Sequence, residues 1–405
     1  MMKKLLLFVL DGLGDRPNPL LNGETPLQAA YRPNLNALVS SGLGGMMYPV
    51  RKGLVCGSDT SHLSLLGYDP EKVYTGRGPF EAMGLGIEAE PGDIAFRANF
   101  ATRNRDGIIS DRRAGRDIPE SGSLARKISF SMNGAEFIVK EGVEHRAALV
   151  IRGKALSPEV SDSDPHEQGR APRKVLPLDD NAKHTADLVN EYLERVRTIL
   201  DASPENTDRE SRGKPAANEL LLRGAGITPR LQPFREKYAL DGACLAGIPL
   251  ITGIGNLAGL HLLKHPGATG RVDTDYNGKV RAAVRALDSH DFVLVNIKAP
   301  DIAGHDGDPL LKRDVIEKID AALGQVVELA DSVVTCVTGD HSTPCTSMEH
   351  SGDPVPILFA AGGMRRNNVR QFDEVHCGIS GFNLLSGDVM TLLMQLSDRL
   401  EKYGA

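Results

Sequence analysis

Seven residues spread along the chain could together hold metal ions and a nucleophile. They are Asp11, Ser58, Asp301, His305, Asp340, His341 and His350. All offer oxygen or nitrogen donors, and three carboxylates with three imidazoles suit two divalent cations. A serine hydroxyl alone is a poor nucleophile at neutral pH, but two metals that hold its oxygen would activate it for phosphoryl transfer.

Several of these donors come soon after short apolar runs that predict buried strands. Asp11 follows LLLFVL directly, while Asp301 and Asp340 come shortly after FVLVNI and VVTCV. Apolar runs of this length, bounded by Gly or Pro, are typical of parallel strands buried on both faces. Because open α/β sheets bind ligands beyond the carboxyl ends of their strands, we expect donors that are far apart in sequence to converge there.

Each of these residues also has an ordinary structural explanation. Asp11 followed by Gly is typical of a tight turn. Asp301 and His305 would share one face of a helix, but the sequence GHDGD fits a loop equally well. Ser58 could open a helix whose N-terminus favours anions, or serve only as its cap. By residue type alone, the rival nucleophiles near Ser58 are Cys56, Thr60 and Ser61.

The composition limits the classes of protein to which the chain can belong. Its 405 residues exceed one ordinary domain, so we expect two. A net charge of −6 argues against broad nucleic-acid binding. Five scattered cysteines without a C-x-x-C motif suit a reducing cytoplasm. The sequence contains no apolar run long enough to span a membrane, and no signal-peptide cleavage site follows LLLFVL.

The order of the predicted elements indicates an α/β core that contains an insertion. Residues 1–78 and 236–405 alternate apolar strands with helices, which predicts a mostly parallel sheet flanked by helices. Residues 79–235 are rich in charge and turns and predict a smaller inserted α+β domain, with 203–215 as an exposed loop. The helices expected in the core include 33–41, 310–330 and 387–402.

The insertion carries a cluster of arginines that could bind phosphate or carboxylate groups. Six fall within one segment: Arg97, Arg103, Arg105, Arg112, Arg113 and Arg116. Guanidinium groups match both kinds of anion bidentately, although most of these residues could equally form a solvated basic face. The motifs RRAG and LLLRGAG, the second containing Arg223, stand out because Gly beside Arg permits close approach of a ligand.

Several well-known nucleotide and hydrolase motifs are absent from the sequence. The chain has no G-x-x-x-x-G-K-[ST], no G-x-S-x-G and no G-x-G-x-x-G. These absences argue against a P-loop, a hydrolase nucleophile elbow and a dinucleotide-binding fold. An arylsulfatase is not favoured either, because CGSDT lacks the C-x-P-x-R pattern.

Motifs along nearly the whole chain keep the order in which they occur in one known family. They include GSDTSHLSLLGYDP, YTGRGPFEAMGLGI, ISDRRAGR, DSDPH, LLLRGAG, GATGRVDTDYNGK, IKAPDIAGHDGD and GDHSTPC followed by HSGDPVP. With these motifs the sequence resembles the archaeal-type cofactor-independent phosphoglycerate mutases of the alkaline phosphatase superfamily. The resemblance implies an alkaline-phosphatase-like core and an isomerase that interconverts 3-phosphoglycerate and 2-phosphoglycerate in glycolysis and gluconeogenesis. It also implies a phosphoserine intermediate and no requirement for 2,3-bisphosphoglycerate.

The resemblance further implies roles for individual residues. One metal site would be Asp301, His305 and His350, and the other Asp11, Asp340, His341 and the nucleophile Ser58. Manganese is the metal it favours, with magnesium, cobalt or zinc as variants. The insertion would be a transferase lid that holds the glycerate. Our candidates there are Arg112, Arg116 and Arg223 for the substrate anions, aided by Lys298 of the core, and Asp164 or His166 for proton transfer.

Two alternatives stay open at this point. A phosphomonoesterase or a phosphonopyruvate-processing enzyme of the same superfamily would share the metal core and differ in the insertion. A non-catalytic sensor of metals or sugar phosphates would not need a metal-activated serine. In every case we expect a small-molecule ligand rather than nucleic acid or membrane, and self-association into a homo-oligomer is left open.

Overall fold

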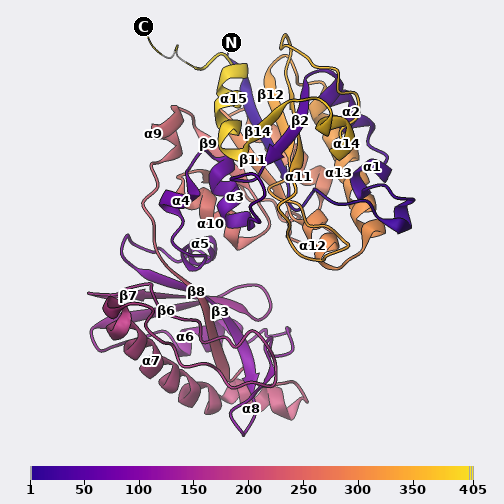
Figure 1. The fold of residues 1–405 in the computed structure, drawn as a ribbon. Helices are drawn as coiled ribbons and strands as arrows, with labels where there is room; N and C mark the ends of the chain where they lie inside the picture. The colour runs from indigo at the N-terminus through magenta and orange to yellow at the C-terminus, as the bar shows by residue number, and fades with distance from the viewer. Residues whose placement is uncertain (1, 401, 403, 405) are drawn as a thin grey trace. The chain divides into compact units, whose positions relative to one another are not determined.

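The computed structural model, which describes residues 2–400, 402 and 404, divides the chain into two units (Figure 1). The core unit comprises Met1–Val73 and Leu231–Ala405, and the insert unit comprises Tyr74–Arg230. Among the described residues, no helix is both long and apolar enough to cross a membrane.

The core unit is built on an eight-stranded sheet with the strand order β10-β9-β11-β1-β12-β13-β2-β14. Its strands are β1 (Lys4–Leu10), β2 (Leu43–Tyr48), β9 (Gly242–Leu245), β10 (His261–Leu262), β11 (Phe292–Ile297), β12 (Val333–Thr338), β13 (Val355–Ala360) and β14 (Asn383–Leu385). Neighbouring strands run parallel except where β13 pairs with β12 and β2. The predicted mostly parallel sheet is therefore confirmed.

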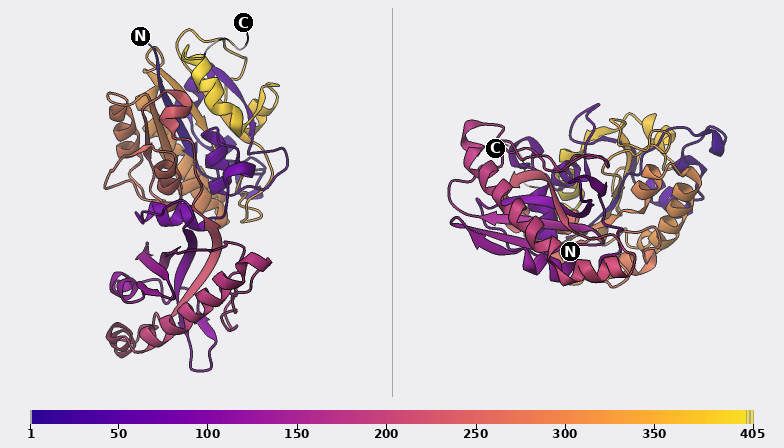
Figure 2. Two further views of the ribbon diagram at one scale, coloured as in Figure 1. Left: turned by 90° about the vertical axis from the view of Figure 1, so that its left-hand side faces the viewer. Right: turned by 90° about the horizontal axis from the view of Figure 1, so that it is seen from below.

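The register of the three central strands brings their carboxyl ends to one edge of the sheet. Leu10 of β1 pairs with Ile297 of β11, and Val9 pairs with Thr338 of β12. These strands are mostly apolar, as expected for a sheet that helices cover on both faces (Figure 2). Consequently, the segments that follow β1, β11 and β12 leave the sheet side by side.

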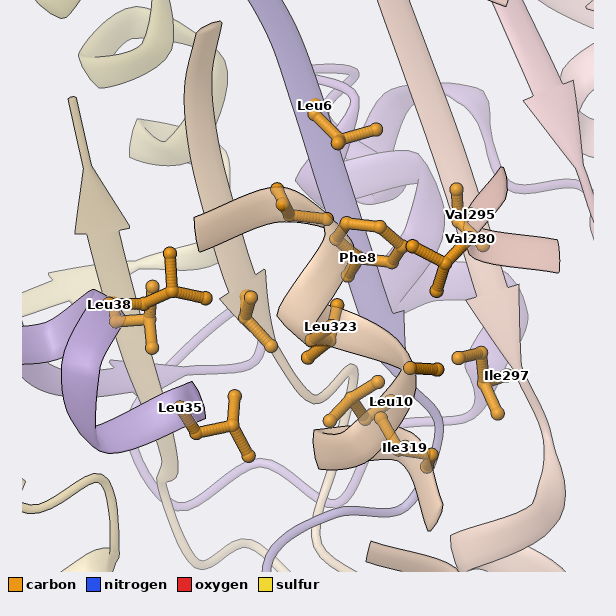
Figure 3. Close-up of a cluster of buried hydrophobic side chains, with 14 of the residues drawn as sticks. Leu6, Phe8, Leu10, Leu35, Leu38, Val280, Val295, Ile297, Ile319 and Leu323 are labelled. Carbon is orange, nitrogen blue, oxygen red and sulfur yellow. The ribbon is translucent and has the colours of Figure 1, made fainter. Parts of the chain in front are cut away.

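The helices of the core unit alternate with the strands, as the sequence predicts. They are α1 (Pro26–Ala29), α2 (Pro33–Ser40), α3 (Ser58–Leu65), α4 (Pro70–Val73), α9 (Phe234–Tyr238), α10 (Pro249–Leu257), α11 (Tyr276–Ala286), α12 (Ala299–His305), α13 (Pro309–Val327), α14 (Glu374–Gly378) and α15 (Val389–Leu396). Helix α13 begins where the Asp308 side chain accepts a hydrogen bond from the Leu311 N–H. Its buried residues recur every three or four positions, so one stripe packs against β1, where Ile319 and Leu323 lie near Leu10 (Figure 3).

The insert unit contains an antiparallel sheet in the order β4-β3-β7-β6-β5, with β8 paired to the other edge of β3. Its elements are α5 (Gly78–Gly84), β3 (Ile94–Arg103), β4 (Ile109–Asp111), α6 (Ser121–Lys127), β5 (Phe130–Met132), β6 (Ala135–Glu141), β7 (Arg146–Arg152), α7 (Lys183–Asp201), α8 (Pro204–Ser211) and β8 (Glu219–Ile227). Phe96 and Phe100 of β3 join the hydrophobic cluster that includes α7, so Arg97 and Asn99 point to the opposite face. The α+β character predicted for this part is confirmed.

Two local predictions are wrong. Residues 203–215 are not a simple exposed loop, because they contain α8 and the fully buried Arg209. The Arg209 guanidinium donates to the carbonyls of Ala114, Asp117 and Pro215, so burial of this charged side chain fixes the segment. The last helix, expected over 387–402, ends at Leu396, and residue 401 of that range lies outside the described residues.

Replacing Leu323 by alanine should lower the free energy of unfolding by roughly 2–5 kcal/mol, because this fully buried side chain would leave a cavity between α13 and β1. Urea denaturation followed by circular dichroism measures the change. Leu310→Ala on the same helix is the control, since Leu310 is 43% exposed and its loss should cost about 0.5 kcal/mol or less. Equal destabilisation by the two substitutions would contradict this account of the core.

Candidate active site

The candidate site lies in the core unit, where the sheet ends bring together the seven predicted donors. Asp11 directly follows β1, while Asp340 and His341 follow β12. Asp301 and His305 lie on α12, so the helical alternative for this pair is the correct one. Ser58 is the first residue of α3, and His350 lies in the loop before β13. Ser58 and His350 both contact His341, which lies at the end of β12.

The first group of donors consists of Asp301, His305 and His350. The Asp301 Oδ1 atom lies 3.5 Å from Nε2 of each histidine, and the two Nε2 atoms are 3.2 Å apart. Nδ1 of His305 donates to the carbonyl of Met348, and Nδ1 of His350 donates to the carbonyl of Cys56, both over 2.8 Å. A carbonyl can only accept, so each Nδ1 carries a proton and each Nε2 can present a lone pair to a cation.

The second group surrounds the hydroxyl of Ser58. Its Oγ atom lies 3.1 Å from His341 Nε2 and 3.4 Å from Asp11 Oδ1. The Thr343 hydroxyl donates to Asp301 over 2.7 Å, so it accepts from His341 Nδ1, which is 3.1 Å away. His341 therefore presents the lone pair of Nε2 to Ser58, in a position to receive a hydrogen bond from the serine.

Asp340 supplies the clearest indication that this arrangement suits a cation. Its Oδ1 atom accepts hydrogen bonds from the backbone N–H groups of Gly12 and His341, each over 3.0 Å. Its buried Oδ2 atom lies 3.4 Å from His341 Nε2 and has no hydrogen-bond partner in the described part of the chain. A buried carboxylate oxygen without a partner is costly unless a positive charge compensates it.

Two sets of donor atoms are close enough to hold a metal ion. One is Asp301, His305 and His350, and the other is Asp11, Asp301 and His341. Both include Asp301, whereas the resemblance places Asp340 in the second set. The stacked rings of His341 and His350, with centroids 3.7 Å apart, join the two sets into one site.

The site concentrates more negative charge than its one lysine offsets. Lys298 Nζ lies 2.8 Å from Asp11 Oδ1 and 2.6 Å from Asp301 Oδ2. Burial and the neighbouring Asp340 raise the pKa of Asp11. Burial would also raise the pKa of Asp301, but the neighbouring Lys298 holds that pKa well below its usual range. Lys298 therefore belongs to the carboxylate cluster, and the remaining negative charge favours added cations.

In the insert unit, the structure brings together four of the predicted lid residues: Arg112, Arg116, Asp164 and His166. Arg112 binds Asp164 bidentately, with Nε–Oδ1 and Nη2–Oδ2 distances of 3.0 and 2.5 Å. Burial opposes ionisation of Asp164, yet the hydrogen bonds from Arg112 and from the His166 backbone N–H lower its pKa. The exposed His166 ring lies 3.0 Å from Asp162. Arg116 joins Arg112 and His166 in lining a surface cavity of about 490 Å³.

The partly buried polar face of the same sheet was not predicted from the sequence, although Arg97 and Arg223 were named as possible anion-binding residues. Arg97 and Asn99 of β3 lie opposite Arg223 of β8 and Arg146 of β7, respectively, in the strand register. Burial lowers the pKa of Arg97 to about 9, although Glu81 opposes this, and the neighbouring arginines contribute to the lowering. The signal was available, because the alternation in IAFRANFAT places Arg97 and Asn99 on one side of the strand.

This face, which we call the arginine face (Arg97, Asn99, Arg146 and Arg223), ranges from the buried Asn99 to the exposed Arg146. Glu81 Oε1 lies 3.9 Å from Arg97 Nε, which is an ion pair but too long for a hydrogen bond. Within the described residues, no hydrogen-bond partner exists for Nε of Arg97, Nε of Arg223 or Oδ1 of Asn99. Nδ1 of the adjacent His145 also has no hydrogen-bond partner among the described residues, although Glu144 Oε2 lies 3.8 Å away. Burial together with Arg146 and Arg97 lowers the pKa of His145 to about 4. Several guanidinium groups with unused donors form a site that suits an anion such as a carboxylate or phosphate.

Comparison with known proteins assigns this chain to one family. A family model described as 2,3-bisphosphoglycerate-independent phosphoglycerate mutase matches residues 40–206. Proteins of that name from Thermoplasma acidophilum and Thermoplasma volcanium are 53% and 51% identical to the chain. The first match covers 100% of both chains, and the second covers 100% of this chain and 99% of its relative.

Two solved structures are similar over almost the entire length of the chain. The cofactor-independent phosphoglycerate mutase from Thermoplasma acidophilum shares 48% sequence identity, with a TM-score of 0.75, and the match covers 98% of this chain and 100% of that one. A protein from Pyrococcus horikoshii shares 37% identity, with a TM-score of 0.87 and complete coverage of both chains.

Proposed function

Because the chain belongs to the family of 2,3-bisphosphoglycerate-independent phosphoglycerate mutases, as its motifs predict, we propose that it interconverts 3-phosphoglycerate and 2-phosphoglycerate through a phosphoserine at Ser58. The observation that carries the proposal is the position of the Ser58 hydroxyl, between the lone pair of His341 Nε2 and the carboxylate of Asp11. Either group can accept the serine proton as the oxygen attacks phosphorus.

In the forward direction, Ser58 Oγ forms a bond to the phosphorus of 3-phosphoglycerate, and the bond from phosphorus to the glycerate 3-oxygen breaks. The glycerate oxygen takes up a proton as it leaves. The 2-hydroxyl then attacks the phosphoserine and gives up its proton, which regenerates the Ser58 hydroxyl. The two phosphoryl-transfer steps together need neither water nor 2,3-bisphosphoglycerate.

The donors of the site fit two divalent metal ions. Asp301, His305 and His350 would hold one ion, and Asp11, Asp340, His341 and Ser58 would hold the other. When bound, the metals supply positive charge that lowers the pKa of the serine hydroxyl and stabilises charge on the phosphoryl oxygens. Oxygen and imidazole donors suit manganese, which we favour, as well as magnesium, cobalt and zinc.

We assign the insert unit the role of a lid that holds the glycerate. Arg223 belongs to the arginine face, whose unpaired donors suit the substrate carboxylate. Arg112 is engaged by Asp164, so the arginine face is a stronger candidate than Arg112 for that carboxylate. Arg116 stays a candidate for an anion contact, and Asp164 and His166 stay candidates for proton transfer.

A phosphatase of the same superfamily would form the same phosphoserine and transfer the phosphoryl group to water. The full-length identity to proteins named as mutases favours the mutase. We also place the activity in the cytoplasm, consistent with the five cysteines, which are all buried and form no disulfide.

Ser58→Ala should abolish turnover of 3-phosphoglycerate and leave the fold intact, because it removes only the attacking oxygen. Wild-type enzyme quenched with acid during turnover should yield a peptide phosphorylated at Ser58, which mass spectrometry detects. Ser61→Ala on the same helix is the matched control and should retain turnover. Phosphate found on Ser61 or Thr60, or an active Ser58→Ala protein, would overturn the assignment.

Removal of metal by a chelator should stop turnover, and adding back Mn²⁺ should restore it with about two ions bound per chain. Asp340→Asn should bind about one ion, because the buried Oδ2 atom no longer offers a full negative charge. Isothermal titration calorimetry with Mn²⁺ measures both stoichiometries. Asp291→Asn, at the amino end of β11, is the control and should bind as the wild type does. Normal turnover by metal-free enzyme would exclude this mechanism.

Arg97→Met should lower mutase turnover about tenfold or more, as expected when a charged contact worth roughly 1.4 kcal/mol is lost. Phosphate release per turnover should rise, because glycerate held less tightly escapes before it is phosphorylated again. An enolase-coupled assay and a phosphate assay measure the two rates. Arg195→Met, which breaks only an exposed pair with Glu191, is the control. An unchanged ratio of the two rates in Arg97→Met would remove the arginine face from the site.

A further inference from the structure

Two buried polar residues beside the site have no part in the steps described above. His62 lies one turn after Ser58 on α3, and its side chain is fully buried. Asn296 is the one polar residue of β11, whose sequence is FVLVNI, and it too is fully buried. Polar side chains buried in this way usually satisfy a specific hydrogen-bonding demand.

The hydrogen bonds of His62 determine which ring nitrogen carries the proton. Nδ1 lies 2.7 Å from the backbone carbonyl oxygen of Ser58, which can only accept. Nδ1 must therefore donate, and in the neutral ring Nε2 is left as an acceptor. Asn296 Nδ2 lies 3.3 Å from that Nε2 atom, so one amide hydrogen of Asn296 can bind it.

The second amide hydrogen of Asn296 reaches the carboxylate of Asp11. Nδ2 of Asn296 lies 3.0 Å from Asp11 Oδ2, while Oδ1 of the same carboxylate faces Ser58 and Lys298. The backbone of Asn296 is itself fixed, because the buried Lys279 donates to its carbonyl over 3.3 Å and to that of Thr269 over 3.0 Å. Asn296 is thus held through its backbone as well as through its side chain.

We propose that His62 and Asn296 are positioning residues that form a hydrogen-bonded bridge from the Ser58 carbonyl to the Asp11 carboxylate. The bridge sets the first turn of α3, which carries the nucleophile, at a fixed distance from Asp11, and it orients Asp11 so that Oδ1 points to the Ser58 hydroxyl. The inference rests on the proposed function, since it concerns the same nucleophile and the same metal ligand. Groups that orient a metal ligand typically contribute 10–100-fold to metal affinity or activity.

Three substitutions separate the two halves of the bridge. The amide of His62→Asn can replace Nδ1 as the donor to Ser58 but cannot reach Asn296. The longer His62→Gln can place its oxygen where Nε2 accepts from Asn296. Asn296→Leu keeps a side chain of similar size and removes both donors. His290→Asn is the matched control, because His290 Nδ1 makes the same contact with a carbonyl four residues earlier, that of Ala286 at 3.0 Å, near the amino end of β11.

Calorimetric titration of the metal-free proteins with Mn²⁺ should show two ions in the wild type. In His62→Asn and Asn296→Leu, one of the two should bind about 10–100-fold more weakly while the other is unchanged. His62→Gln should retain more affinity than His62→Asn. The double variant His62→Asn with Asn296→Leu should be no weaker than the weaker single variant, since both changes break the same bridge. The kcat value should fall with KM changed by less than about threefold.

The outcomes distinguish the bridge from the proposed function and from a merely structural role. Unchanged affinities in both single variants, equal weakening of both ions, or additive losses in the double variant would overturn the bridge. Thermal melting of the metal-free proteins, with His290→Asn for comparison, monitors folding, and a loss of stability without selective loss of one ion would also overturn it. A wild-type protein that binds no Mn²⁺ and forms no phosphoserine would refute the proposed function itself.

Discussion

Three buried carboxylates of like charge meet at one edge of the core sheet, and the rest of the site is arranged to tolerate them. Asp11, Asp301 and Asp340 would repel one another in a medium that screens charge poorly. The chain offsets part of this repulsion with Lys298, which contacts two of the three, and with backbone N–H groups that bind one oxygen of Asp340. The other oxygen of Asp340 has no hydrogen-bond partner in the part of the chain that the structure describes, so added positive charge would stabilise it.

The same constraint explains why Nδ1 of each histidine donates to an oxygen atom of the protein. His305 and His350 each donate through Nδ1 to a backbone carbonyl, and His341 donates to the Thr343 hydroxyl. These contacts select one tautomer, so that every Nε2 faces the carboxylates as a neutral donor to metal. Fully protonated rings would offset the carboxylates but would compete with metal ions for the same oxygens. The site therefore keeps a net negative charge, and this charge favours the binding of cations.

How much of this could be predicted depended on whether a signal was local in sequence. Apolar runs followed by Asp11 or Asp340 predict donors at the strand ends, and parallel topology brings those ends together. The spacing of Asp301 and His305 left helix and loop equally open, and only the structure places them on α12. The burial of Arg209 and the pairing of Arg112 with Asp164 join segments far apart in sequence, so residue types alone could not distinguish them from a solvated face.

In the function that we propose, the two units have different tasks. Water and a glycerate hydroxyl are both oxygen nucleophiles, so the phosphoserine that we propose at Ser58 would offer little basis to choose between them. What distinguishes glycerate is a carboxylate that stays negative throughout the reaction. In the function that we propose, the arginine face of the insert unit would bind such a group through guanidinium nitrogens that have no hydrogen-bond partner among the described residues, and burial there lowers the pKa of Arg97. An anion bound there would offset the like charges of the partly buried guanidinium groups. The preference for glycerate over water would then arise from the favourable interaction of its carboxylate with these groups.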